Sequence, residues 1–219
     1  TFKAPKSASV LYAVSDDPRV QGAIIEAGEV AMVAAIGWIE REAIRVRRGS
    51  HNQAWLAAHA DEPGAGPRHI DFHPRKPFAY VINELDSTIT AFDYDATRGA
   101  FTVRQTVSTL PADFKGASTT AEVRVHPNGR FLYGSNRGHD SIASYRIGDD
   151  GKLTLLSIDP SLGKGPQNLL ITPDGQWLLC ANMPGNSVVV FKIQAETGKL
   201  QATGKPVEMP MPSCIRWVE

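Results

Sequence analysis

Three segments of the chain share one pattern of residues, and this internal repeat constrains the fold more than any other feature of the sequence. They cover residues 66–101, 121–153 and 165–200. His73, His126 and Thr172 each precede a proline at the same place in the pattern, which gives steps of 53 and 46 residues. The extra length of the first unit lies in one loop, residues 108–120. Such a repeat predicts a row of similar units that pack against one another.

Each unit contains four strand signals separated by turn sequences rich in Gly, Pro, Asn and Asp. The expected strands are residues 70–72, 78–82, 88–94 and 101–106, then 123–125, 131–135, 141–147 and 152–157, then 169–171, 177–181, 187–193 and 199–203. Four antiparallel strands repeated about every 40 to 50 residues are typical of a β-propeller blade. We therefore expect an all-β fold, a partial or small β-propeller with three complete four-stranded blades.

The two ends of the chain depart from the repeat. Residues 212–218 have the pattern of the first strand of a further blade, and residues 9–14 and 22–25 have that of its second and third strands. We expect these segments to form one blade shared by the termini, because such a blade would close a ring and remove its exposed edges.

The N-terminal region also contains a segment that fits no blade. Residues 27–48 are rich in Ala and in charged residues, a composition that favours a helix. The sequence therefore predicts an atypical N-terminal region, residues 1–60, followed by the propeller, residues 61–219.

Composition and charge argue against several classes of function. Lys and Arg number 23, Asp and Glu also number 23, and 42% of the residues are hydrophobic, as in a soluble globular protein. A neutral chain gives no general attraction to a phosphate backbone, so we expect no nucleic-acid partner. No apolar run is long enough to span a membrane and the start lacks an apolar signal core, which predicts a cytoplasmic protein with no membrane contact.

The cysteines do not suggest a metal site. Cys180 and Cys214 are the only two, and neither has the spacing of a zinc ligand. No other pattern argues for a bound group, so we expect neither a metal nor an organic cofactor.

Residues 66–218 also resemble a known family. The motifs GPRHIDFHP, FAYVINELDSTITAF, TLPADFKG, AEVRVHPNGRFLYGSNRGHDSIASY and PSCIRWV occur here in the order of the C-terminal part of the propeller-type lactonases. Members of that family include 6-phosphogluconolactonase and the fungal carboxymuconate cyclase. The resemblance implies a seven-bladed propeller, of which this chain carries three complete blades, as an incomplete or internally deleted member would.

The resemblance implies an active site at the mouth of the central channel. It assigns to this site Arg68 of the GPRH motif, Glu84 of INELDS and Arg137 of SNRGHDS. Two arginines can clamp a phosphate or carboxylate, and a carboxylate between them can orient or deprotonate water for attack on a lactone carbonyl. We expect hydrolysis of a sugar-acid lactone, a small-molecule substrate, with these three residues as the catalytic group. From spacing alone, Arg68 and Glu84 could instead form a structural ion pair.

Four further residues are candidates for substrate contact: His69, Asn83, Asn136 and His139. Each of them also has a structural interpretation. His69 stands near a turn, as His73 and His126 do, and could serve in a turn or in packing. The asparagines recur at one place of the repeat, as a turn residue would. His139 could pair with Asp140 at a loop tip.

One departure from the family supports an alternative function. The family carries a GPHxH motif one blade before GPRH, whereas upstream of Gly66 this chain has only His51 and His59, in unrelated contexts. The missing motif and the small number of blades favour a catalytically inactive propeller remnant, a binding or assembly module that associates with itself through open blade edges. A muconate-type cycloisomerase, which uses similar groups, is a second alternative.

Overall fold

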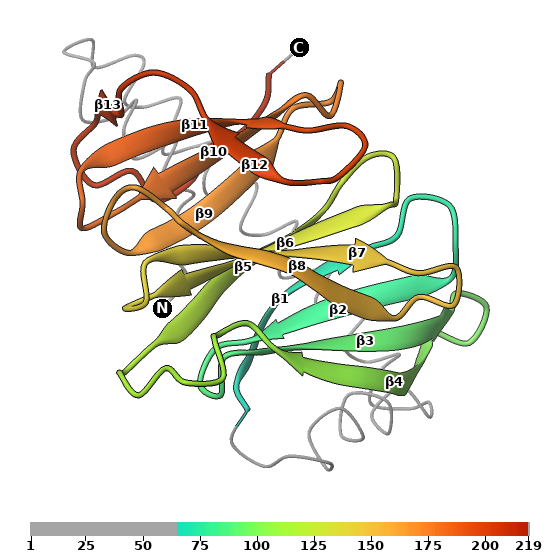
Figure 1. Cartoon of the computed structure of the whole chain (residues 1–219). Coiled ribbons are helices and arrows are strands. Elements are labelled where there is room, and N and C mark those ends of the chain that lie inside the picture. Colours follow the sequence, from blue (N-terminus) through green and yellow to red (C-terminus); the bar gives the residue numbers. More distant parts are fainter. Residues whose placement is uncertain (1–64, 219) are drawn as a thin grey trace, which may run out of the picture. The chain divides into compact units, whose positions relative to one another are not determined.

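The computed structural model describes residues 65–218, which belong to the second of two compact units of the chain, Ala54–Glu219. Within this part the chain forms strands and no helix. The strands make three antiparallel sheets that lie side by side in the order of the sequence (Figure 1). The predicted all-β fold is confirmed.

Each sheet is one blade. The first contains β1 (Pro67–Phe72), β2 (Phe78–Asn83), β3 (Thr88–Asp95) and β4 (Ala100–Ser108). The second contains β5 (Thr119–Val125), β6 (Phe131–Arg137), β7 (Ser141–Ile147) and β8 (Leu153–Pro160). The third contains β9 (Pro166–Ile171), β10 (Trp177–Asn182), β11 (Ser187–Ile193) and β12 (Leu200–Ala202), and the short β13 (Val207–Glu208) also pairs with β11. Within each blade the four strands follow chain order, as the repeat predicts.

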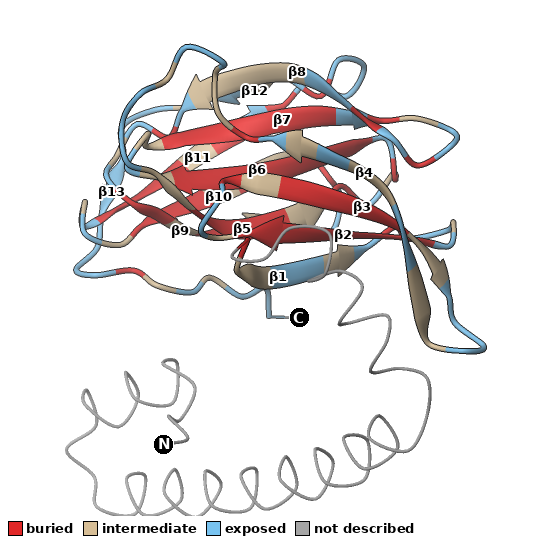
Figure 2. Cartoon of the chain, turned by 90° about the horizontal axis from the view of Figure 1, so that it is seen from below, coloured by how far each residue is buried: buried red, intermediate tan, exposed pale blue. Residues whose placement is uncertain are grey.

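Burial differs across each blade (Figure 2). β2 is buried along its whole length and β6 at all but its last residue, whereas β4 and β12 have no buried residue. β2 up to Ile82 and the first three residues of β6 are continuous apolar runs, as expected where both faces of a strand are covered. The core therefore lies between neighbouring blades, and their contact stabilises the fold.

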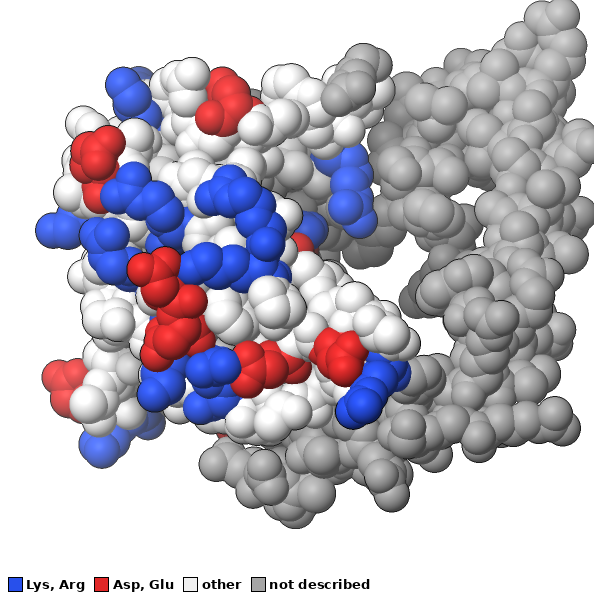
Figure 3. Space-filling model, turned by 90° about the vertical axis from the view of Figure 1, so that its right-hand side faces the viewer, with Lys and Arg blue, Asp and Glu red and all other residues white. Residues whose placement is uncertain are grey.

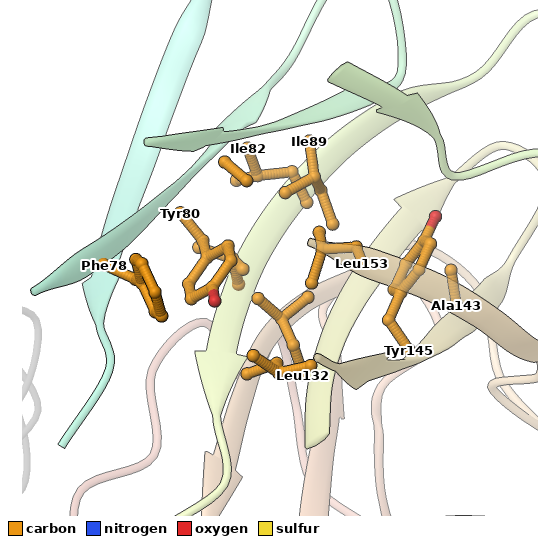
Figure 4. Close-up of a cluster of buried hydrophobic side chains, with 11 residues drawn as sticks. Phe78, Tyr80, Ile82, Ile89, Leu132, Ala143, Tyr145 and Leu153 are labelled. Carbon is orange, nitrogen blue, oxygen red and sulfur yellow. The ribbon is translucent and has the colours of Figure 1, made fainter. Parts of the chain in front are cut away.

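A cluster of apolar side chains fills the space between the first two blades (Figure 4). Its larger members are Phe78, Tyr80, Ile82 and Ile89 from the first blade and Leu132, Tyr145 and Leu153 from the second. Burying each side chain of this size contributes about 1.5–3 kcal/mol relative to leaving it exposed. A second cluster, which includes Phe131, Leu169 and Phe191, joins the second and third blades in the same way.

Two hydrogen bonds, which we call the blade clasp, join the first blade to the second. His73 Nε2 lies 3.0 Å from the carbonyl oxygen of Gly129, and the Tyr80 hydroxyl donates to the carbonyl oxygen of Gly151 over 3.1 Å. Both acceptors are turn glycines with positive φ, 72° and 78°. A side chain at either glycine would collide with a ring of the first blade, so the clasp needs glycine there.

The clasp recurs between the second and third blades. His126 bonds Gly175 over 2.8 Å and Tyr133 bonds Gly198 over 2.9 Å. His73 and His126 are therefore packing residues at blade junctions, as one of the two interpretations from the sequence had it. In the third blade the same places are taken by Thr172 and Leu179, which have no imidazole or phenol to offer.

Ion pairs also cross the blade boundaries at the surface. Lys76 Nζ lies 2.7 Å from Asp149 Oδ1, and Arg130 Nη2 lies 3.7 Å from Glu196 Oε2. Figure 3 shows a face of the molecule on which basic and acidic side chains lie next to one another. Exposed pairs contribute little, about 0–1 kcal/mol each, so the apolar clusters and the clasp dominate the junctions.

The first clasp is expected to make stability depend on pH. His73 Nδ1 accepts hydrogen bonds from the backbone N–H groups of Arg75 and Lys76, which fixes the neutral tautomer with its proton on Nε2. Burial, followed by the nearby charges of Lys76 and Arg75, lowers the pKa of His73. As pH falls through the ordinary histidine pKa of about 6.5, His73 therefore becomes protonated in the unfolded chain while it stays neutral in the folded chain. The stability present at neutral pH is thus lost towards acid pH.

The measurement is denaturant unfolding of the full chain and of the variant His73→Gln between pH 7.5 and 5. At pH 7.5 we expect the variant to be less stable by about 1–3 kcal/mol, because the backbone partners of the buried ring at Gly129, Arg75 and Lys76 lose their hydrogen bonds. The difference should shrink as pH falls. A difference that stays constant with pH would contradict this account.

The ends of the chain differ from the prediction. Residues 212–218 form no strand, because they enter no ladder of backbone hydrogen bonds. The backbone N–H of Ile215 donates instead to the side chain of Asn168 over 2.8 Å. The predicted partner strands, residues 9–14 and 22–25, and the predicted helix, residues 27–48, lie outside the described residues. The boundary at residue 60 stays a prediction.

In the described part, no helix meets the length and hydropathy needed to cross a membrane.

Candidate active site

The first strand of every blade breaks its regular register near its beginning. In β1 the extra residue is Arg68, in β9 it is Gln167, and in β5 the register skips Ala121 and Glu122. A β-bulge re-aims the side chains that it carries, and bulges are common next to active sites. The three bulges occupy the same place in the repeat, so they form one row across the three blades.

The strands expected from the sequence, residues 70–72 and 131–135, leave out Arg68 and Arg137, whereas the structure places both residues within strands. Arg68 lies within β1 at the bulge, and Arg137 is the last residue of β6, where it pairs with Thr119 of β5. The irregular register lets both strands extend to these residues, which fixes the start of each side chain on a rigid element.

Arg68, Glu84 and Arg137 come together as the sequence predicts. Glu84 follows β2, and its backbone N–H donates to the carbonyl oxygen of Gly66. Its Oε2 lies 3.6 Å from Arg68 Nε, and its Oε1 accepts a hydrogen bond from Arg137 Nη2. The side chains keep 19%, 34% and 24% of their surface exposed, in chain order, so the group is partly buried and open to a small molecule.

Further contacts of the two arginines tie this group to all three blades. Arg68 Nη1 donates to the carbonyl oxygen of Ala121, and Arg137 Nη2 donates to that of Thr120 over 2.9 Å. Arg137 Nη1 also donates to Gln167 Oε1 in the third blade, over 3.3 Å. The guanidinium groups are therefore held in place before any ligand arrives, which is the condition for selective binding of an anion.

The charge of the group favours an anionic ligand. Two guanidinium groups share one carboxylate, which leaves one positive charge. Burial, followed by the nearby charge of Arg137, lowers the pKa of Arg68. Because these two positive groups repel each other, an additional negative charge between them would be stabilised. Guanidinium groups bind carboxylates and phosphates with paired hydrogen bonds.

Comparison with known proteins identifies the family. The family model for "Lactonase, 7-bladed beta-propeller" matches residues 44–217. The chain belongs to this family. Its three blades are thus blades of the family's propeller. The assignment of Arg68, Glu84 and Arg137 as its active site stays a prediction.

Curated relatives and solved structures agree with this assignment. The chain is 36% identical over 162 residues to a 6-phosphogluconolactonase of Bacillus subtilis, covering 74% of this chain and 46% of the relative. It is 37% identical over 152 residues to a 6-phosphogluconolactonase of Pectobacterium carotovorum, covering 69% of this chain and 45% of the relative. The chain therefore spans about half the length of these relatives.

Among solved structures, a periplasmic gluconolactonase of Pseudomonas aeruginosa is 30% identical, with a TM-score of 0.68 over 72% of this chain and 44% of that one. A putative 6-phosphogluconolactonase of Bacteroides fragilis is 33% identical, with a TM-score of 0.66 over 72% of this chain and 43% of that one. Both superpose on the blades of this chain.

The N-terminal region is similar to a different family. The model for the TrwC relaxase matches residues 1–59, about a quarter of the chain, and all of them lie outside the described residues. The two matches overlap in residues 44–59.

The four residues predicted to contact a substrate fall into two groups. Asn83 and Asn136 are buried, and their amides bond protein atoms. Asn83 Nδ2 donates to Thr88 and Thr90. Asn136 Nδ2 donates to Ser141 Oγ over 3.1 Å and also to the carbonyl oxygen of Thr109, after β4 of the first blade, over 2.9 Å. Both asparagines thus hold the turn between the second and third strands of their blades, which was the alternative interpretation from the sequence.

The two histidines are more open. His139 Nδ1 lies 2.7 Å from Ser141 Oγ, and its ring meets the ring of Phe114 edge-on at 4.7 Å. His69, next to Arg68, places its Nδ1 3.0 Å from Glu122 Oε1. His69 is therefore beside the arginine and glutamate group, whereas His139 lies with the loop that carries Phe114.

Glu122 is the residue of this region that the sequence analysis missed. It lies in the β5 bulge, and only 2% of its side chain is exposed. A signal for it exists in the repeat, since the residue four places before His73, His126 and Thr172 is polar in every blade. Among residues 65–218, no group of three or more His, Cys, Asp or Glu side chains is placed to hold a metal ion.

Proposed function

We propose that this chain hydrolyses the lactone of a phosphorylated sugar acid, as a 6-phosphogluconolactonase does. The observation that carries the proposal is the group of Arg68, Glu84 and Arg137, two arginines around one carboxylate and joined to all three blades. The names of the relatives from Bacillus subtilis and Pectobacterium carotovorum support the same substrate class.

The proposed roles follow from the geometry. Arg68 and Arg137 bind the anionic group of the substrate, and Glu84 holds both of them in place. Glu84 also orients the water that attacks the lactone carbonyl. A guanidinium N–H or a nearby backbone N–H stabilises the negative oxygen of the tetrahedral intermediate. A phosphorylated lactone does not cross membranes freely, so the proposed reaction belongs in the cytoplasm.

A panel of substrates tests the proposal on the purified full chain. The panel contains 6-phosphogluconolactone, gluconolactone without the phosphate, and a carboxymuconate. We expect hydrolysis of 6-phosphogluconolactone above its spontaneous rate, and a lower kcat/KM for gluconolactone, because the phosphate supplies the charge that the arginines bind.

Each other outcome points to a different function. Turnover of the carboxymuconate alone would replace the proposal by the cycloisomerase alternative. A higher kcat/KM for gluconolactone than for its phosphate would assign the arginines to another part of the substrate. A folded chain that accelerates no reaction of the panel would overturn the proposal and support the binding module.

A further inference from the structure

Glu122 is a buried carboxylate that the proposed roles do not use. Its Oε2 accepts a hydrogen bond from Asn168 Nδ2 over 2.6 Å. Its Oε1 lies 3.0 Å from His69 Nδ1 and 3.4 Å from Arg124 Nη2, yet it has no hydrogen bond of good geometry. Burying a charge in this way is costly unless a partner group gains from it.

The partner that is open to solvent is His69. Its side chain is 42% exposed, while Nδ1 faces the buried Glu122. The exposed part of the ring is therefore the part with Nε2. A carboxylate beside Nδ1 holds the proton on that nitrogen and leaves a lone pair on Nε2, so the imidazole can accept a proton there. A small rotation of this exposed ring would align the Nδ1–H with Oε1, and such contacts often tighten only when substrate binds.

His69 also stands in the right place. It follows Arg68 directly, at the β1 bulge, and so shares the strand end that carries the anion-binding group. The negative charge of Glu122 interacts with the charges of Arg68 and Asp71 on β1 and with that of Arg124 on β5. Glu122 is therefore electrostatically coupled to the anion-binding group.

Glu84 is poorly suited to take the proton itself. Each of its two oxygens faces a guanidinium group, Oε2 towards Arg68 and Oε1 towards Arg137. Protonation of Glu84 would remove the negative charge that both guanidinium groups face. The site therefore has a carboxylate for orientation and needs a separate proton acceptor.

We propose that His69 is this acceptor and that Glu122 is its positioning residue; the proposal rests on the lactonase function above. His69 Nε2 takes a proton from water while the water oxygen bonds to the carbonyl carbon of the lactone. The imidazolium then gives that proton to the ring oxygen as the bond between carbonyl carbon and ring oxygen breaks. The imidazole is restored, and the product is the open-chain hydroxy acid, whose carboxyl proton passes to solvent.

Kinetics of three variants test the catalytic part. We expect His69→Gln to lower kcat for 6-phosphogluconolactone about 10²- to 10⁴-fold and to remove the acidic limb of the pH–rate profile. Glu122→Gln is expected to lower kcat at least about 10²-fold, because the amide N–H₂ would place its proton towards Nδ1 and force the other tautomer. The double variant should be no slower than His69→Gln, since the two residues act as a unit. Glu208→Gln, at an exposed carboxylate of β13, is the matched control and should keep full activity.

The tautomer of His69 tests the pairing without any turnover. Nitrogen chemical shifts of the ¹⁵N-histidine-labelled full chain, with the His69 signals assigned from their loss in His69→Gln, should show the Nδ1–H form. In Glu122→Gln they should show the Nε2–H form. This measurement on the unsubstituted chain does not depend on the folding of Glu122→Gln.

The outcomes separate the two proposals. Full turnover in His69→Gln, or the Nε2–H form in the unsubstituted chain, would overturn the roles of His69 and Glu122 and leave the lactonase function standing. No turnover by the unsubstituted chain would overturn the lactonase function, and the proton transfer with it, even if the Nδ1–H form shows that Glu122 orients the ring.

Discussion

Replacing Glu84 by glutamine is expected to lower kcat/KM for 6-phosphogluconolactone about 10³-fold. The substitution keeps the shape of the side chain and removes its charge. One of its two ends becomes an N–H₂ group, which cannot accept a hydrogen bond from the arginine that it faces. Arg68 and Arg137 would then lose the negative group that holds them together. We therefore expect weaker binding of the anionic group and a less well positioned attacking water.

Steady-state kinetics of the Glu84→Gln and Glu196→Gln variants, side by side, measure this effect. Glu196 is an exposed glutamate whose described ion pair is with Arg130, so its substitution should leave kcat/KM unchanged. The two variants should have the same circular dichroism spectrum. Their free energies of unfolding should agree to within about 0.5 kcal/mol. Turnover at the unsubstituted rate in Glu84→Gln would remove Glu84 from the catalytic group.

Replacing Gly151 by alanine is expected to lower the free energy of unfolding by about 3 kcal/mol. Gly151 has a φ of 78°, a conformation that costs alanine about 1–2 kcal/mol. A Cβ atom there would also lie 2.8 Å from the ring of Phe78 in the neighbouring blade. Moving that ring would disturb the apolar cluster between the blades and the bond from Tyr80, which adds about 1–3 kcal/mol.

Gly204 provides the matched control for this substitution. Its φ is 67°, close to that of Gly151, but no atom lies within 4 Å of the place where a Cβ would stand. Gly204→Ala should therefore cost only the backbone strain, about 1 kcal/mol after the lower entropy of the unfolded chain is counted. Denaturant unfolding of both variants gives the comparison. Equal losses in the two would show that the contact between Gly151 and the first blade contributes nothing.

The blades could be predicted from the sequence because their signals are local. The sequence Pro127-Asn128-Gly129 specifies a turn by itself, and the short apolar segments on either side of it predict strands. The expected strand at residues 212–218 failed for the opposite reason. A strand exists only if another strand pairs with it, and an apolar pattern at the end of a chain carries no information on that partner.

Part of the candidate site could be predicted from the sequence and part could not. Arg68, Glu84 and Arg137 could be named from a family resemblance, but their meeting could not be derived from spacing, since Arg137 is 53 residues from Glu84. Glu122 was missed because a glutamate in a strand is ordinarily exposed. The β5 bulge turns it inward, towards Asn168 and His69, and no local sequence signal announces a bulge of this kind.

The blade clasp gives each blade a direction. A blade donates from an imidazole and a phenol on one side and accepts at two turn glycines on the other, so two blades can join in only one order. Among the described blades, only the second has both halves, with His126 and Tyr133 on one side and Gly129 and Gly151 on the other. A copy of the second blade inserted after itself would meet matching partners at both junctions, whereas a copy of the third would not. The second blade is therefore the unit by which a chain of this kind could lengthen through duplication.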